Sequence, residues 1–384
     1  MTQKFTINAD FPGGNILVEK AEEDHVYLRQ DLRDTSTFWF YWAFCIRGAQ
    51  GRNITFHFTG GDVLGVRGPA VSYDNGASWQ WLGDNVVNRD NNEDITFSHE
   101  FLPKHTKVLF AFCPVYTQQN LDTFLSHIPK STFLQKDILC KSRKGRDVEL
   151  LRLGNSSSAI KVLFTCRHHS CEATASYVLE GILETLLGED ETGNWWRENI
   201  DVAVIPFVDK HGVEEGDQGK NRAPHDHNRD YAGESIYPEV RAIRQFVPDW
   251  LRENDSCIAL DLHCPHIRGD ANEDIYFVGS PSPQIWKETQ KFSRIWEKLN
   301  NSPIPFDPCN NLPFGQKWNV ANNYAQGKSF GKWACELPNM RLASAIEFPY
   351  ANAGAAEVNP ENYRELGNCL AKALREYLEI ANIV

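Results

Sequence analysis

The chain has 384 residues, of which 41% are hydrophobic and 12% aromatic, as in a globular protein with a large core. This length is enough for two domains of roughly 100–200 residues each. The formal net charge of -12 argues against nucleic acid or an anionic membrane as a partner, because both attract basic surfaces.

The N-terminal segment, MTQKFT, lacks the apolar run of a signal peptide. No later stretch approaches the roughly 20 apolar residues of a membrane span. The ten cysteines show no framework spacing, and several lie in apolar segments. We therefore expect reduced thiols in a cytoplasmic protein.

Residues 5–115 are predicted to form short β-strands. The aromatic segment 38–46 is typical of a buried strand, and apolar residues alternate with polar ones at 54–58. The sequence Asp-Asn-Gly at residues 74–76 is a turn signal before another aromatic segment. Short strands with regular turns predict a β-sandwich.

After about residue 120 the pattern changes to helices alternating with apolar strands. Continuous apolar strands are predicted at residues 161–166, 202–208, 257–262 and 342–348. The segment 171–187 has helical spacing, and Asn359 with Pro360 begins a helix that runs to about residue 380. This alternation predicts an α/β domain around a mostly buried sheet.

The segment 167–172, RHHSCE, joins an apolar strand to a helix and carries the most informative motif. His169 and Glu172 are three residues apart, so their side chains can lie close enough to hold one metal ion. His168 is an alternative ligand. The pair alone is a weak signal in a chain with 12 histidines and 51 acidic residues, and a catalytic zinc site usually needs a third protein ligand.

Two further polar side chains stand at strand ends, where ligands bind in open α/β sheets. His263 follows the strand 257–262, and Glu347 interrupts the apolar strand 342–348. A carboxylate in an apolar strand costs free energy unless it is satisfied, which favours a functional role. The structural alternatives are a hydrogen-bonded strand-end histidine and a buried salt bridge to an arginine.

A long polar loop, residues 217–231, follows the strand 202–208. Nearby glycines and a proline favour a loop there. Arg222, Asn228 and Arg229 suit a carboxylate ligand, because guanidinium groups bind carboxylates through paired hydrogen bonds. A solvated surface loop is the alternative interpretation.

Taken together, these residues resemble the signature of the zinc metallocarboxypeptidases. The matching series is His169, Glu172, Arg222, Asp226, Asn228, Arg229, His263, Tyr324 and Glu347. The N-terminal half, with Gly14-Asn15 and Trp39-Phe40-Tyr41, resembles the domain that precedes the catalytic domain in cytosolic carboxypeptidases, in a compact bacterial-type form. The resemblance implies an antiparallel β-sandwich domain at residues 1–118. At residues 119–384 it implies an α/β catalytic domain, a mixed central sheet flanked by helices.

The resemblance also implies one zinc ion per chain, bound by His169, Glu172 and His263. Asp226 would accept the other ring N–H of His169 and fix its orientation. Glu347 would be the general base that activates the attacking water.

The same resemblance assigns substrate contacts to the polar loop. Arg222 would stabilise the oxyanion of the tetrahedral intermediate. Asn228, Arg229 and Tyr324 would hold the C-terminal carboxylate of the substrate one residue from the zinc, which makes the enzyme an exopeptidase.

Lys332 is the predicted specificity residue. In this family the pocket for the terminal side chain is reached about seven or eight residues after the substrate-binding tyrosine, here Tyr324, which gives Gly331 or Lys332. A lysine there would favour a terminal Glu or Asp, and the glutamate-trimming cytosolic branch points the same way. Lys328 lies close by, and the alternative is that both lysines are on the surface.

Several features depart from the family pattern. The short segment before Asn228 leaves the placement of Arg222 open. Cys171 stands where a small or basic residue is usual. His266 is a rival for the third metal ligand, and Tyr350 is a rival for the carboxylate-binding tyrosine.

The predicted function is a zinc-dependent carboxypeptidase acting on peptide or protein C-termini. A zinc-dependent deacylase of N-acyl amino acids is the alternative within the hydrolases. A non-catalytic peptide-binding protein is a third hypothesis, and the complete ligand set with Glu347 argues against it.

Overall fold

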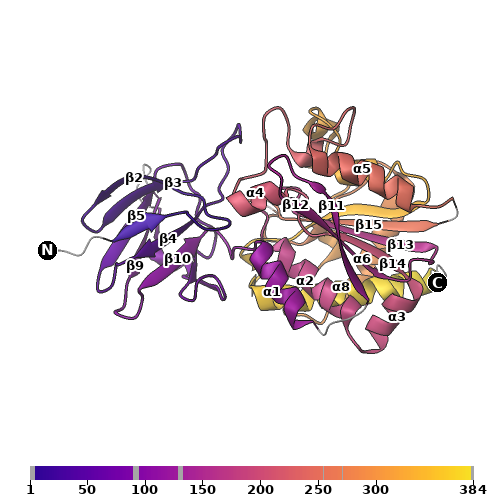
Figure 1. Ribbon diagram of the computed structural model, residues 1–384, viewed down its shortest axis with the longest axis horizontal. Helices are drawn as coiled ribbons and strands as arrows, with labels where there is room; N and C mark the ends of the chain where they lie inside the picture. Colours follow the sequence, from indigo (N-terminus) through magenta and orange to yellow (C-terminus); the bar gives the residue numbers. More distant parts are fainter. Residues whose placement is uncertain (1–4, 90–94, 129–132, 254, 270, 382–384) are drawn as a thin grey trace.

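The computed structural model describes residues 5–89, 95–128, 133–253, 255–269 and 271–381. A unit of β-strands lies beside a larger unit in which helices cover a sheet (Figure 1). Within the described ranges, no helix is long and apolar enough to cross a membrane. All ten cysteines are free thiols.

The N-terminal unit contains two five-stranded sheets. The first, in spatial order, comprises β1 (Thr6–Asn8), β4 (Ala43–Arg47), β10 (Lys107–Ala111), β6 (Ala70–Ser72) and β7 (Gln80–Trp81). The second comprises β2 (Leu17–Glu22), β3 (His25–Arg29), β5 (Asn53–Phe58), β9 (Ile95–Glu100) and β8 (Val87–Asn88). The pair β3–β5 runs parallel and so departs from the predicted antiparallel pattern. The chain leaves for the first sheet to form β4 between them, and such a crossover returns the next strand parallel.

The predicted strand at residues 38–46 is shorter than expected, because only Ala43–Arg47 forms β4. Before β4, the amide of Tyr41 donates to Oε1 of Gln218 at 2.8 Å, and the Tyr41 carbonyl accepts from Nε2 of Gln218 at 2.8 Å. A side chain from the other unit therefore takes up backbone groups that a neighbouring strand would have paired. The aromatic residues before Ala43 are therefore explained by their burial and not by pairing in a sheet.

Aromatic side chains from both N-terminal sheets share one core. Phe44 of β4 lies 5.3 Å from Phe56 of β5 between ring centroids, and Phe110 of β10 lies 5.4 Å from Phe97 of β9. The turn predicted at residues 74–76 is present between β6 and β7, with Asn75 and Gly76 both at positive φ.

The larger unit is built on a mixed seven-stranded sheet, as predicted. In spatial order its strands are β11 (Leu134–Lys141), β12 (Asp147–Gly154), β14 (Asp201–Ile205), β13 (Ile160–Cys166), β15 (Ser256–His263), β17 (Met340–Glu347) and β16 (Tyr276–Phe277). The four central strands β14, β13, β15 and β17 run parallel, and β12 and β16 on either side run antiparallel to them. The edge strand β11 pairs antiparallel with β12. The four predicted apolar strands are these central four.

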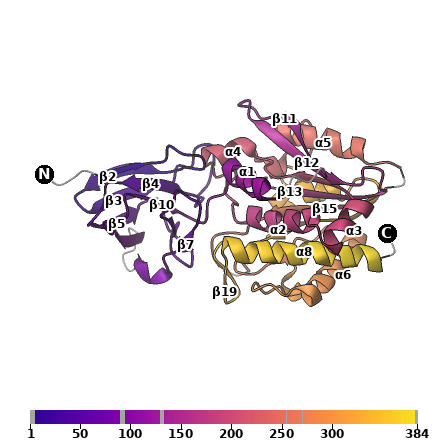
Figure 2. The ribbon, with the colours of Figure 1, turned by 60° about the horizontal axis from the view of Figure 1, so that its bottom comes forward.

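Helices cover both faces of this sheet (Figures 1 and 2). They are α1 (Gln118–His127), α2 (Ala175–Leu187), α3 (Glu191–Asn199), α4 (Lys210–Glu215), α5 (Pro238–Trp250), α6 (Pro283–Leu299), α7 (Phe330–Ala334) and α8 (Pro360–Ile380). Alternate strand residues enter two separate cores, Val162 beside α2 and α8, and Leu163 beside α5 and α7. As predicted, α8 begins with Asn359 as N-cap and Pro360 in its first turn.

Glycines allow α2 and α8 to cross closely, and Figure 2 shows these helices side by side. A Cβ atom on Gly181 would lie 1.9 Å from the carbonyl oxygen of Arg364, and one on Gly367 would lie 2.1 Å from that of Val178. Both positions therefore require glycine at this separation. The crossing fixes the position of α2. The candidate metal-binding motif, residues 167–172, comes just before this helix.

Candidate metal centre and substrate cleft

Three neighbouring parallel strands deliver the candidate residues to one edge of the sheet. The motif at 167–172 follows the end of β13, and β15 pairs alongside β13. His263 ends β15 and pairs in register with Glu347, which ends β17. The carboxyl ends of parallel strands meet at one edge, so residues nearly 180 positions apart in the sequence come together.

The turn after β13 is held by Arg167, whose backbone adopts a positive φ of 62°. Its buried guanidinium donates to the carbonyl oxygen of Tyr116 at 3.0 Å and to Oγ of Ser176 at 3.1 Å. A non-glycine residue in this region is strained, and such strain persists only where the surroundings fix it. Arg167 thereby sets the directions of the two histidines that follow.

His169, Glu172 and His263 form a compact buried group. The Nδ1 atom of His169 lies 2.9 Å from Oε1 of Glu172, and the Nδ1 atom of His263 lies 2.7 Å from Oε2 of Glu172. Their three ligand atoms lie within 4.8 Å of one another. Burial raises the pKa of Glu172, but His169, Lys220 and His263 outweigh that effect and lower it, so the carboxylate stays ionised.

This group fits a zinc ion by the chemistry of its donors. Two imidazole nitrogens and one carboxylate are a ligand set of catalytic zinc sites, which leave a further position open. Beside it, Oε2 of Glu347 is buried and has no hydrogen-bond partner among the described residues. An unsatisfied buried carboxylate oxygen is costly, and water at an open metal position would satisfy it.

A second group, His168, Asp261 and His263, also has metal-binding spacing. Both ring nitrogens of His168 are already engaged, Nδ1 with Asp261 at 2.8 Å and Nε2 with the hydroxyl of Tyr231 at 2.7 Å. His168 is thus fully satisfied by protein groups. The geometry favours His169 over His168 as a ligand.

In the favoured group, each histidine has a carboxylate near its second ring nitrogen, Nε2. Asp226 lies 3.5 Å from Nε2 of His169, at the position predicted for it, and Asp261 lies 2.6 Å from Nε2 of His263. Burial raises the pKa of Asp261, but His168 and His263 outweigh it and hold that pKa below its usual range. The sequence reasoning missed Asp261, although residues two apart in a strand share a face and Asp261 precedes His263 by two.

Glu347 lies next to His263 across the β15–β17 pairing and lines the cleft. Burial raises the pKa of Glu347, His263 opposes the shift, and the nearby carboxylate of Glu172 adds to it. A raised carboxyl pKa makes this side chain a stronger base than an exposed glutamate.

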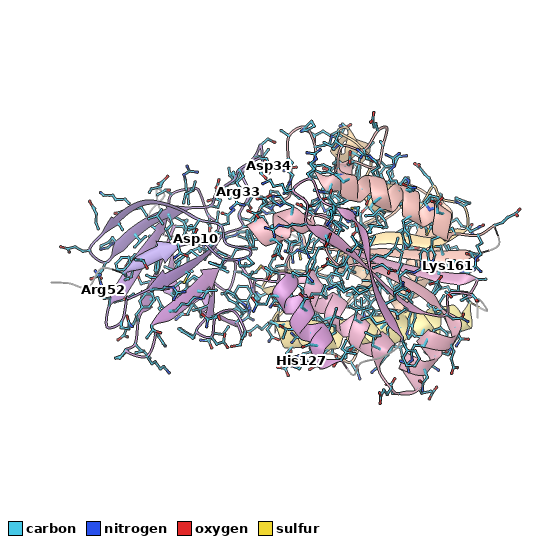
Figure 3. The ribbon with its side chains drawn as sticks, in the orientation of Figure 1. Asp10, Arg33, Asp34, Arg52, His127 and Lys161 are labelled. Atoms are coloured by element: carbon cyan, nitrogen blue, oxygen red, sulfur yellow. The ribbon has the colours of Figure 1, made fainter. Side chains whose placement is uncertain are left out.

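The structure does not bring Arg222 into this group. Its Nη2 lies 2.8 Å from Asp209 and 2.9 Å from Asp217, and its Nη1 lies 3.3 Å from Asp34. Figure 3 shows Asp34 in the loop at the junction of the two units. Burial lowers the pKa of Arg222, but Asp209 and Asp217 outweigh it and raise it. The positive charge of Arg222 is therefore paired with these carboxylates at the junction of the two units.

Lys220, which the sequence reasoning did not select, occupies the cleft instead. Its Nζ lies 3.2 Å from Oε1 of Glu172 and 3.2 Å from Nδ1 of His169. Burial lowers the pKa of Lys220, but Glu172 and Glu347 outweigh it and raise the pKa, so the ammonium is retained. The composition of the loop gave no signal that distinguished Lys220 from Arg222.

The cleft has a volume of about 330 Å³, and His169 and His263 of the metal group line it together with the predicted carboxylate-binding residues. The Nδ2 atom of Asn228 lies 3.3 Å from Nε2 of His263, and its Oδ1 accepts from the amide of Phe330 at 2.8 Å. Arg229 donates to the carbonyl oxygen of Asn228 at 2.8 Å. A larger cavity of about 1290 Å³ lies elsewhere, beside α1, and contains none of the residues predicted for the site.

Tyr324 and Lys332 also line the cleft. Nζ of Lys332 lies 3.2 Å from the ring centroid of Tyr324, and Cζ of Arg229 lies 5.0 Å from it. The hydroxyl of Tyr324 donates to Oδ1 of Asn319 at 2.9 Å. Burial and the neighbouring Arg229 lower the pKa of Lys332 to about 8.

The two rival residues lie outside these positions. The exposed ring of His266 packs edge-on against Trp39 and Phe40, at 5.6 and 5.1 Å between centroids, and joins neither metal-binding group. Tyr350 is 3% exposed, and its hydroxyl lies 3.9 Å from Sγ of Cys171. The geometry therefore favours His263 as the third ligand and Tyr324 as the cleft tyrosine.

Known proteins share sequence and fold with this chain. The model of the zinc carboxypeptidase family matches residues 119–312, a range that ends before Tyr324 and Glu347. Cytosolic carboxypeptidase 3 of Mus musculus is 27% identical over 293 residues, 66% of this chain and 28% of the relative. Cytosolic carboxypeptidase 6 of Caenorhabditis elegans is 23% identical over 316 residues, 75% of this chain and 67% of the relative. The chain thus spans less than a third of the mouse relative.

Solved structures share the fold over nearly the whole chain. A metallo-carboxypeptidase from Burkholderia cenocepacia has a TM-score of 0.81 at 19% identity, covering 98% of this chain and 99% of that one. A metallo-carboxypeptidase from Pseudomonas aeruginosa, solved with (2-guanidinoethylmercapto)succinic acid, has a TM-score of 0.76 at 20% identity, covering 97% and 99%. With half of its length matched by the family model, this chain belongs to the zinc carboxypeptidase family, a family of metal-dependent hydrolases.

Proposed function

We propose that the chain is a zinc-dependent carboxypeptidase that hydrolyses the last peptide bond of a peptide or protein. One observation carries the proposal. His169 and His263 of the buried His169–Glu172–His263 group line one cleft of about 330 Å³ together with Asn228 and Arg229. A site that holds a terminal carboxylate at a fixed distance from the reacting centre selects the last bond of a chain.

In this proposal His169, Glu172 and His263 hold one zinc ion, with Asp226 and Asp261 fixing the two imidazoles from behind. When bound, zinc lowers the pKa of water toward about 7 and polarises a carbonyl oxygen.

Glu347 is the proposed general base. Its raised pKa and unpartnered Oε2 suit a carboxylate that accepts a proton from the attacking water and passes it to the leaving amine. Asn228, Arg229 and Tyr324 hold the terminal carboxylate, because a guanidinium and neighbouring donors match its two oxygens.

We further propose a preference for acidic terminal residues. Lys332 lines the cleft and stacks on Tyr324, so its ammonium faces the region that the terminal side chain would enter. A cation in a partly desolvated pocket attracts Glu or Asp and repels Lys or Arg.

The N-terminal unit forms part of this site in our proposal. We infer that residues 1–118 fold as a sandwich, supported by the ring contacts between its two sheets, and that residues 119–384 form the catalytic domain. Trp39 of the first domain lines the cleft of the second. The free cysteines and the names of the cytosolic relatives support a cytoplasmic location.

The proposal is tested with the full chain loaded with zinc and incubated with peptides that end in Glu, Leu or Lys. Mass spectrometry should show loss of single terminal residues, fastest for Glu. The same peptides with an amidated C-terminus are the control and should resist cleavage. Cleavage of N-acyl amino acids but not of peptides would support the deacylase instead, and binding without cleavage would support a peptide-binding protein.

A further inference from the structure

The ammonium of Lys220 stands within the candidate metal centre, although nothing in the family pattern points to it. Its Nζ lies 3.2 Å from Oε1 of Glu172 and 3.2 Å from Nδ1 of His169. Its side chain is 23% exposed, so the charge is at the wall of the cleft, not in bulk water. His169 and Glu172 would hold the zinc ion of the proposed function, and Lys220 lines the same cleft as Glu347, so its ammonium would be close to a carbonyl that this ion polarises.

The backbone around Lys220 is fixed on both sides. Gly219 has φ of 70°, and a Cβ atom there would lie 2.3 Å from the amide nitrogen of Ser170. Asn221 has φ of 48°. The carbonyl oxygen of Lys220 accepts from Oγ1 of Thr35 at 2.9 Å. The side chain therefore starts from a backbone with little freedom to turn away from the cleft.

Further contacts hold the adjacent residue and the side chain. The amide of Asn221 donates to Oδ2 of Asp226 at 3.0 Å, and its Nδ2 donates to Oγ1 of Thr37 at 2.9 Å. Nζ of Lys220 lies 5.5 Å from the ring centroid of Trp39. An aromatic face attracts a cation at this distance. Both domains thus orient one ammonium.

Arg222, the arginine that the family pattern selects for oxyanion stabilisation, does not have its guanidinium free to reach a substrate in the cleft as Lys220 does. Arg222 pairs with Asp209, Asp217 and Asp34, and it does not line the cleft. Releasing it would leave buried carboxylates without their partner, which is strongly unfavourable.

We propose that Lys220, in place of Arg222, is the oxyanion-stabilising residue of the reaction proposed above. Its ammonium donates a hydrogen bond to the substrate carbonyl oxygen as water attacks the carbonyl carbon and negative charge moves onto that oxygen. The proton stays on Nζ throughout, and the donated bond weakens again when the carbonyl re-forms. A charge oriented beforehand in a partly dry site stabilises such a transition state without reorganising at the moment of reaction.

The test compares Lys220→Met and Lys220→Arg with Lys298→Met, a control on the exposed face of α6. For Lys220→Met we expect kcat to fall about 10²–10³-fold with KM nearly unchanged, as for loss of an oxyanion-hole donor. Lys220→Arg should recover part of the loss. Lys298→Met should match the wild type.

Two further measurements separate this role from a structural one. Zinc content by elemental analysis should be the same in all four proteins. The affinity of the zinc-loaded proteins for a phosphinic dipeptide analogue, whose tetrahedral oxygens resemble the transition state, should fall with Lys220→Met by about the same factor as kcat/KM. Affinity for the free product amino acid should stay the same.

The outcomes are distinguishable. An inactive wild type would overturn the proposed function, and with it this role. An active wild type with equally active Lys220→Met would overturn only the role of Lys220. Loss of zinc in Lys220→Met, or equal loss of affinity for product and phosphinate, would also overturn it, because Lys220 would then support the site's structure.

Discussion

At the scale of single residues, Glu172 is the centre of the site because each of its two carboxylate oxygens faces a histidine Nδ1 atom. Its burial is complete, with 0% exposure, so its charge depends entirely on nearby groups. Two imidazoles and an ammonium satisfy it in part. A divalent cation would satisfy it fully, which is why the group is better explained by metal binding than by an ordinary buried network.

The first prediction concerns metal content. The purified protein should hold about one zinc per chain, and His169→Ala or His263→Ala should each remove it, because a catalytic site has few protein ligands to lose. His266→Ala is the matched control and should keep zinc. Elemental analysis decides the matter. Zinc retained in His263→Ala but lost in His266→Ala would show that the wrong histidine was chosen, and loss confined to His168→Ala would move the metal to the second group.

The second prediction concerns Glu347. Glu347→Gln should lower kcat by about 10²–10⁴-fold, because the amide cannot accept the proton of the attacking water. Zinc content and peptide binding should remain, since Glu347 belongs to neither metal-binding group. Glu336→Gln removes an exposed carboxylate in a neighbouring segment and is the control. Peptide turnover and elemental analysis measure the two effects, and zinc loss in Glu347→Gln would make it a ligand and contradict the mechanism.

The positions of His263 and Glu347 could be predicted from the sequence because polar residues at the ends of apolar strands are a local pattern. The position of Lys220 could not, because it depends on how a loop with positive φ at Gly219 and Asn221 folds back onto Ser170. Arg222 shows the converse: its residue type and order suit the family pattern, but Asp34, Asp209 and Asp217 pair with its guanidinium.

At the scale of elements, the segment from η4 (Ala321–Tyr324) to α7 (Phe330–Ala334) forms one end of the cleft. Residue counting from Tyr324 predicted Gly331 or Lys332 for the pocket of the terminal side chain, and both line the cleft. The Ser329 side chain accepts from the amide of Lys332, which starts the helix at a defined position after Tyr324. The ammonium then lies over the tyrosine ring.

The third prediction is the pH dependence of terminal-residue preference. The pKa of Lys332 is lowered to about 8, so its ammonium is present below that pH and lost above it. The ratio of kcat/KM for a Glu-ending peptide to that for a Leu-ending peptide should therefore fall severalfold as pH rises through about 8. Titrations that change kcat/KM equally for both peptides leave this ratio unchanged.

Two variants control that measurement. Lys332→Met should give a low ratio at every pH. Lys328→Ala should keep the wild-type profile, because Lys328 pairs with the exposed Glu336 outside the cleft. If the Leu peptide is cleaved fastest by all three proteins at all pH values, the acidic preference is wrong, whereas the carboxypeptidase proposal is unaffected.

The fourth prediction concerns the α2–α8 crossing. Alanine favours a helix over glycine by about 1 kcal/mol, but at Gly367 its Cβ would lie 2.1 Å from the Val178 carbonyl oxygen. Gly367→Ala should therefore lower the free energy of unfolding by on the order of 1–3 kcal/mol through overpacking. Denaturant unfolding measures it, with Gly65→Ala as a control, because a Cβ atom there would meet only the Gly68 carbonyl oxygen at 3.9 Å. A stabilised Gly367→Ala protein would show that the helices separate at no cost.

The boundaries of helices and strands were the feature hardest to predict from the sequence. The helix predicted at 171–187 begins at Ala175, because residues before it bend to present Glu172 to both histidines. The aromatic segment at 38–46 becomes a strand only from Ala43. In both places a contact with a distant part of the chain decides the backbone, and no local pattern encodes it.

At the scale of the whole molecule, the loop at 217–222 is held by the N-terminal unit rather than by solvent. Gln218 binds both backbone groups of Tyr41, and the Asn221 carbonyl accepts from the amide of Ser36 at 3.0 Å. Nearby, Nδ2 of Asn15 donates to the carbonyl oxygen of Gly216 at 2.7 Å. Figure 3 shows Arg33 at the same junction, where its guanidinium pairs with Asp217. The N-terminal unit therefore shapes the loop that carries Lys220 to the cleft.

The fifth prediction tests this dependence through Trp39, whose ring lies under Lys220 and whose Nε1 donates to Sγ of Cys171 at 3.3 Å. Trp39→Ala removes a cation–π contact of about 0.5–2 kcal/mol, so kcat/KM on peptides should fall roughly 2- to 30-fold. Zinc content and thermal unfolding should change little, because the side chain is only half-buried. Phe38→Ala, at an exposed neighbouring ring, is the control. An equal loss from both variants would point to general damage at the junction, and no loss from Trp39→Ala would mean that the N-terminal domain supports the loop through its backbone contacts alone.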